Sequence, residues 1–127
     1  MLPLAHTNRT LNVENIEVAI DLDFNAEDVA SLGGIGVISV LSNIIPKDVH
    51  NMTTSYFEGK NEEATKLQLD TLNLTKALFC EVNPIPVKAA LNMVGYNAGI
   101  PRLPLIEMSK SGQERLKDEL KKYGVLK

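Results

Sequence analysis

Two segments in the first third of the chain have the hydrophobic patterns of β-strands. Residues 16–22 (IEVAIDL) alternate apolar residues with small or charged ones, which is the two-residue period of a strand. Residues 36–41 (GVISVL) form a nearly continuous apolar run rich in β-branched residues, typical of a strand buried on both faces of a parallel sheet. Residues 25–32 lie between them and have the pattern of a short helix. This order predicts a βαβ unit with a right-handed crossover.

The rest of the chain has the hydrophobic period of helices. Apolar residues recur every three or four positions within residues 46–59, 61–79 and 83–95, so we expect a helix in each range. Asn61 is the expected N-cap of the second of these helices. The pattern as a whole therefore predicts an α/β protein in which one βαβ unit is followed by helices.

The end of the chain combines a loop with a last helix. Two prolines in residues 98–105 exclude a helix there. Ser111 and Glu114 have the spacing of a capping box and predict that a helix begins at this point. Gly124 is the expected end of that helix.

Composition and charge narrow the classes of function. The 127 residues include 16 acidic and 13 basic side chains, a net charge of −3, and no basic patch, so nucleic acid is not an expected partner. No apolar run approaches the roughly 20 residues of a membrane-spanning helix, so a membrane is not expected either. The single cysteine, Cys80, cannot form an internal disulfide, and the first residues do not have the pattern of a signal peptide. We therefore expect a cytoplasmic protein.

Three segments resemble the dihydrodipicolinate synthase and N-acetylneuraminate lyase family. They are residues 33–43 (GGIGVISVLSN), 78–88 (LFCEVNPIPVK) and 102–105 (RLPL), in the order and spacing of the family. Together they favour the synthase branch. The resemblance covers about residues 16–127, but it corresponds only to the C-terminal part of family members, whose (β/α)₈ barrel alone needs roughly 250 residues.

The resemblance implies an α/β fold that is only part of a TIM barrel. Residues 1–59 are expected to hold the last two βα units, with strands at about 16–22 and 36–41. Residues 60–127 are expected to form the C-terminal helical subdomain. Two parallel strands are too few for a sheet that is stable by itself. The remaining strands are therefore expected from a larger barrel or from a partner chain.

The resemblance also implies a reaction, the condensation of pyruvate with aspartate semialdehyde through a lysine Schiff base. This is a lyase-class step of lysine biosynthesis through diaminopimelate, and it needs no cofactor. In the family the Schiff-base lysine and the proton-relay tyrosine lie on strands that precede the matched region. No lysine occurs here before Lys47. We therefore expect a truncated homologue that is inactive alone and contains no catalytic residue of its own.

Two positions correspond to the family's substrate site. The main chain of Ile38 matches the isoleucine that lines the pyruvate pocket. Asp21 stands where the family has a glycine beside the Schiff base. A carboxylate at that point would repel the carboxylate of pyruvate, because the two groups carry like charge.

Other side chains allow both a chemical and a structural interpretation. Asp21 and Asp23 are expected on the same side of the predicted strand. They could form an acid–base pair, or they could simply be the solvated end of the strand. His50 is expected at the surface of a helix, and Cys80 is expected to be a buried thiol and not a nucleophile. Lys88 could mimic a Schiff-base lysine, but it is expected to be a surface lysine. No cluster has the spacing of metal ligands.

Two further functions stay open. The chain could be one half of a split Schiff-base aldolase that binds pyruvate only when a complementary chain supplies the rest of the barrel. It could also be a non-enzymatic module that binds another protein through unpaired strand edges and apolar helix faces. Unpaired edges also predict a homo-oligomer.

Overall fold

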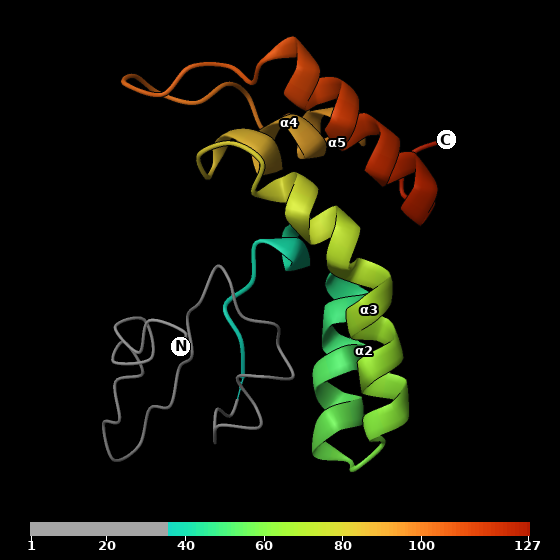
Figure 1. Cartoon of the computed structure of the whole chain (residues 1–127). Coiled ribbons are helices and arrows are strands. Elements are labelled where there is room, and N and C mark those ends of the chain that lie inside the picture. Colours follow the sequence, from blue (N-terminus) through green and yellow to red (C-terminus); the bar gives the residue numbers. More distant parts are fainter. Residues whose placement is uncertain (1–35) are drawn as a thin grey trace, which may run out of the picture. The chain divides into compact units, whose positions relative to one another are not determined.

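The computed structural model describes residues 36–127 and divides the chain into two compact units. Among the described residues, the first unit consists of 36–39 and 47–68, and the second of 40–46 and 69–127. Figure 1 shows the chain coloured along its sequence. The expected strand at 16–22 and the short helix after it lie outside the described residues.

The first unit is a helical hairpin. Helix α2 spans Pro46–Phe57, and helix α3, which spans Asn61–Leu78, begins just after it. The first half of α3 turns back beside α2 (Figure 1). Val49, Met52 and Ala64 are buried, as the helical period predicts. Both helices are thus confirmed, except that Asn61 is the first residue of α3 and not its cap.

Two glycines end helices in the left-handed conformation. Gly59 follows α2 with φ of 77°, and Gly124 follows the last helix with φ of 90°. A side chain would strain the backbone at such an angle, whereas glycine adopts it freely. At the first of these turns the N–H of Lys60 donates to the carbonyl of Ser55, which satisfies one of the last free carbonyls of α2. The sequence predicted both helix ends.

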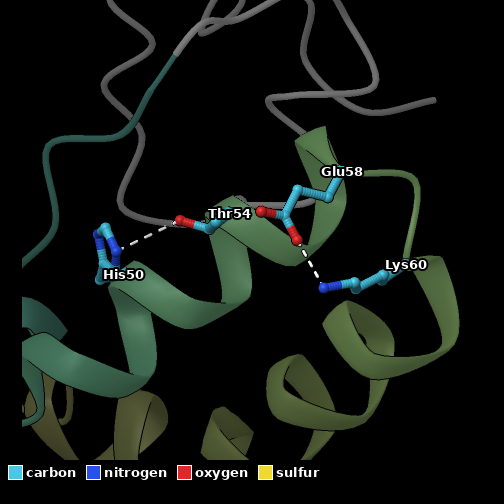
Figure 2. A network of polar contacts seen from close by, with 4 residues as sticks. All are labelled: His50, Thr54, Glu58 and Lys60. Carbon is cyan, nitrogen blue, oxygen red and sulfur yellow. Dashed lines mark hydrogen bonds and ion pairs between the residues drawn. The ribbon is translucent and has the colours of Figure 1, made fainter.

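The exposed surface of the hairpin carries two polar contacts (Figure 2). His50 Nε2 lies 3.5 Å from Thr54 Oγ1, one turn further along α2. Lys60 Nζ donates a 2.6 Å hydrogen bond to Glu58 Oε2. This hydrogen bond, together with the attraction between the charges, lowers the pKa of Glu58 and raises the pKa of Lys60. Solvent screens both charges, so the pair contributes little to stability.

The strand expected at residues 36–41 is not confirmed. Val37 is a single bridge residue, and Leu41–Asn43 form the short 3₁₀ helix η2. Residues 36–127 contain no longer extended element. A central strand needs neighbours on both sides to pair its backbone groups, which explains why an apolar, β-branched run alone does not produce one here.

The second unit has an apolar core built mainly from helices. Helix α4 spans Ile85–Met93 and packs against both η2 and helix α5, which spans Lys110–Tyr123. Between α4 and α5 lies the proline-containing segment 98–105, which is not helical, as the sequence predicts. The largest side chains that are completely buried in this unit are Thr71, Leu74, Leu78, Pro86, Leu116 and Leu120.

Helix α5 begins two residues earlier than the capping box expected from Ser111 and Glu114 would place it. Its N-cap is Ser109 and not Ser111: Ser109 Oγ accepts from the backbone N–H of Gly112 at 3.1 Å. Glu81 also contacts this cap, because its Oε1 accepts from Ser109 Oγ at 2.5 Å and from the Ser109 backbone N–H at 3.3 Å. The capping box predicted from Ser111 and Glu114 is therefore wrong. The carboxylate that completes the cap comes from Glu81, 28 residues earlier in the chain.

The two serines at the start of α5 should respond differently to substitution. Ser109→Ala is expected to lower the free energy of unfolding by about 1 kcal/mol, because the Gly112 N–H loses its acceptor. Ser111→Ala removes only a hydroxyl–hydroxyl contact of 3.3 Å, so it should change stability much less. Urea unfolding of the two variants compares them directly. A larger loss with Ser111→Ala would show that the cap is assigned to the wrong residue.

Candidate functional site

Of the two residues expected at the substrate site, the structure describes only Ile38. Asp21 lies outside the described residues, and so does Asp23. Ile38 lies in the irregular segment before η2, and its side chain is 61% exposed. An exposed side chain is compatible with a role for the main chain only, which is the role that the resemblance implies. That role stays a prediction.

The polar stretch after Ile38 forms a tight turn. The N–H of Asn43 and its Nδ2 both donate to the carbonyl of Val40, at 3.1 and 3.0 Å. Leu41, within this turn, and Ile45, two residues after it, are buried. The first family motif thus ends in a hydrogen-bonded turn that is anchored by two apolar side chains.

The second family motif ends on α4, which holds the loop that leads into the third motif. Lys88, on α4, donates from Nζ to the backbone carbonyl of Ile100 at 3.0 Å. Asn92, one turn further along α4, donates to the carbonyl of Gly99 at 2.9 Å and accepts from the N–H of Ala98 at 2.9 Å. Lys88 is half-buried, and its ammonium group binds the backbone. It therefore fixes a loop, a role that neither the surface nor the Schiff-base interpretation described.

A groove of about 500 Å³ lies where α4, this loop and the start of α5 come together. Its polar groups are largely engaged in holding the walls together: besides the Lys88 and Asn92 contacts, Gln113 Nε2 donates to the carbonyl of Met108 at 2.8 Å. Glu107 supplies an exposed carboxylate at its edge. The groove is lined by Ile85, Lys88, Ala89, Asn92, Met93, Gly99, Ile100, Pro101, Glu107, Met108 and Gln113.

A second, open cavity of about 640 Å³ lies beside α5 and carries a positive charge. Four lysines and one carboxylate line it, and none of these side chains is buried. Exposed lysines keep their hydration, so the cavity offers no preorganised site for an anion. Its lining consists of Met93, Lys110, Gln113, Glu114, Lys117, Lys121, Leu126 and Lys127.

The remaining candidate side chains do not come together. His50 is exposed on α2, as the sequence predicted. Cys80 is a free, half-buried thiol after α3. Among residues 36–127, no three His, Cys, Asp or Glu side chains are grouped so that they could hold a metal ion. None of the helices described in this range is both long and apolar enough to cross a membrane.

Comparison with known proteins explains the motifs. The dihydrodipicolinate synthetase family matches residues 10–123 of this chain. The chain belongs to this family. The match includes the turn before α2, helix α4 and the loop that Lys88 and Asn92 hold.

Curated relatives in the family are synthases that are much longer than this chain. The chain is 57% identical over 99 residues to 4-hydroxy-tetrahydrodipicolinate synthase 1 of Clostridium acetobutylicum, covering 78% of this chain and 34% of the relative. It is 51% identical over 114 residues to the Thermoanaerobacter sp. X514 synthase, covering 90% and 38%. The chain thus spans little more than a third of the length of these relatives.

Solved structures of the family agree with the fold. The chain superposes on dihydrodipicolinate synthase of Thermotoga maritima with a TM-score of 0.77 and 42% identity, covering 80% of this chain and 34% of that one. The synthase of Cyanidioschyzon merolae gives a TM-score of 0.76 at 34% identity, covering 85% and 39%. These similarities support the α/β class predicted from the sequence. The part of the chain that is described, residues 36–127, is helical, so the partial barrel is not confirmed.

Sequence reasoning missed two residues that organise this family region. Asn92 holds the loop and Glu81 caps α5, and each acts on backbone groups that are distant in sequence. The absence of a side chain at Gly112, where a capping box has its acid, is the one sequence signal that could have pointed to Glu81.

Proposed function

We propose that this chain provides the C-terminal part of a 4-hydroxy-tetrahydrodipicolinate synthase. The family match over residues 10–123, combined with coverage of 34% and 38% of two named synthases, is the observation that carries the proposal. In this proposal residues 1–59 complete a barrel with its last two βα units, and residues 60–127 form the helical subdomain attached to it. The complete protein would act in the cytoplasm, in lysine biosynthesis through diaminopimelate.

The proposed chemistry divides between this chain and the rest of the enzyme. In a Schiff-base aldolase, a lysine amine attacks the carbonyl of pyruvate, water leaves and an imine forms. Our assignment places that lysine and the relay tyrosine in the part of the synthase that this chain does not match. This chain would supply the main chain of Ile38 to the pyruvate pocket, with Asp21 close by.

The isolated chain should therefore be inactive, and two arrangements would restore activity. The remaining strands could belong to the same polypeptide or to a complementary chain of a split enzyme. A homo-oligomer of this chain alone would place further copies of the same helices together but would still lack the lysine. A purely protein-binding role, the other open function, predicts no activity in any of these arrangements.

Trapping of the Schiff base tests the proposal. The probe is a fusion of the Clostridium acetobutylicum synthase, without the segment that matches this chain, to the complete 127-residue chain. With pyruvate and borohydride, we expect the fusion to gain one reduced pyruvate adduct, located by peptide mass spectrometry in the Clostridium part. The isolated chain should gain none.

Two controls keep the result interpretable. Lys88→Met in the fusion should leave the adduct in place, because Lys88 holds the loop and is not the proposed nucleophile. A fusion that folds, as shown by a cooperative thermal transition, but gains no adduct and makes no product would contradict the proposal. An adduct on any lysine of the isolated chain would contradict the assignment of the nucleophile to the missing part.

A further inference from the structure

The last helix carries basic charge in a chain that is acidic as a whole. Residues 110–127 contain six basic and three acidic side chains, a net charge of +3. The residues before them contain seven basic and 13 acidic side chains, a net charge of −6. Lysines recur at the helical period along α5 (red in Figure 1) and line the cavity of about 640 Å³ described above. We call the four lysines of this cavity the basic face of α5; they are Lys110, Lys117, Lys121 and Lys127.

The stability of α5 itself does not explain the positions of these lysines. Lys110 lies in the first turn, which has no acidic residue, and there the helix dipole disfavours a cation. Lys117 and Lys121 lie one turn apart on the same side of the helix, where like charges repel. None of the four lysines makes an ion pair within residues 36–127. The basic face therefore keeps a positive charge that an acidic partner would neutralise.

The basic face also has an apolar floor and the length of about three helical turns. Met93, from α4, and Leu126 are half-buried and line the same cavity. The helix rises about 16 Å from Lys110 to Lys121. A single small anion gains little from one hydrated lysine, but several carboxylates on one partner bind together, because the first contact raises the effective concentration of the others. The face is thus suited to an extended acidic partner.

We propose that the basic face of α5 binds an acidic amphipathic helix of another protein. The charge selects carboxylates, and their required spacing is the helical spacing of the lysines themselves. Met93 and Leu126 select an apolar residue among those carboxylates. Nucleic acid fits the face less well, because no aromatic side chain lines the cavity for a base to stack on. The inference concerns this surface only and does not depend on the proposed function.

Fluorescence anisotropy with the complete 127-residue chain tests the proposal. The probe is a fluorescein-labelled peptide of about 18 residues, five helical turns, with glutamates and one leucine on a single side of the helix. The control peptide has the same composition, but its glutamates are distributed around the helix. We expect the single-sided peptide to bind at least about tenfold more tightly than the control, and salt to weaken its binding by screening the charges.

Charge reversal locates the binding surface. Lys117→Glu combined with Lys121→Glu should weaken binding of the single-sided peptide at least about tenfold. The matched control combines Lys66→Glu with Lys76→Glu, two exposed lysines of α3, and changes the net charge equally. It should leave the affinity within about twofold, because distant surface charges are screened. The neutral pair Lys117→Gln and Lys121→Gln should also weaken binding, and circular dichroism checks that every variant keeps its helices.

Several results would overturn the proposal. Equal binding of the two peptides, or equal losses with the α3 and α5 variants, would mean that only net charge matters. No binding of the single-sided peptide at low salt would mean that the basic face is simply a solvated surface. Tighter binding of a single-stranded oligonucleotide, lost in the α5 variants, would show that the face binds nucleic acid instead. None of these results affects the proposed function, which is tested by the Schiff-base adduct of the fusion.

Discussion

Leu116→Ala should lower the free energy of unfolding of the second unit by about 2–5 kcal/mol, which is more than any surface substitution should cost. Leu116 lies on α5 with no exposed surface, and α5 packs against α4. Truncation removes apolar contacts and leaves a cavity that tightly packed neighbours fill only in part. The measurement is the urea midpoint, followed by circular dichroism of the helices.

The matched control is the same truncation at an exposed leucine. Leu103→Ala removes the same atoms from a side chain that is 87% exposed, so it should change the free energy of unfolding by less than about 0.5 kcal/mol. Similar losses at the two positions would mean that α5 is not buried as described.

The second large effect concerns Glu81, whose carboxylate caps α5 from the loop that precedes α4. Glu81→Ala should lower the free energy of unfolding by about 1–2 kcal/mol, because Ser109 loses the acceptor of both its hydroxyl and its backbone N–H. Gly112 lies against the same carboxylate: a Cβ there would collide with Glu81 Oε1. Gly112→Ala should therefore displace Glu81 and lose the same hydrogen bonds.

A double-mutant cycle tests this connection. With Glu81 already replaced by alanine, Gly112→Ala no longer meets the carboxylate. Its Cβ still lies 3.0 Å from Met108 Cε and 3.1 Å from Ser109 Oγ, so we expect a smaller loss than in the native chain and no gain. The double variant should therefore be more stable than the sum of the two single losses predicts. Strictly additive losses would contradict the contact. The readout is the free energy of unfolding of all four proteins in urea.

Local sequence patterns were sufficient to locate the helices of residues 36–127. Each of these signals depends only on residues a few positions apart, so it can be read from the sequence alone. They are the hydrophobic periods of α2, α3 and α4, the proline-containing loop and the glycine at residue 124. The family motifs in residues 78–88 and 102–105 were equally visible, and the match over residues 10–123 confirms the family.

Features that depend on distant residues could not be predicted in this way. The run at 36–41 has the composition of a buried strand, but whether it pairs depends on strands elsewhere. The start of α5 was misplaced because Ser111 and Glu114 fit a local rule, while the carboxylate that binds the cap comes from Glu81. For the substrate site, the prediction at Ile38 came only from resemblance and is untested.

The Glu81–Ser109 contact also bears on the order in which this region can come apart. The first turn of α5 keeps its capping carboxylate only while the segment between α3 and α4 stays in place. Fraying of α5 from its N-terminus and opening of that segment are thus coupled, so they belong to one cooperative opening event and not to two independent ones. A protease cut within either segment should consequently release both, and a peptide of α5 alone begins without the carboxylate that caps it.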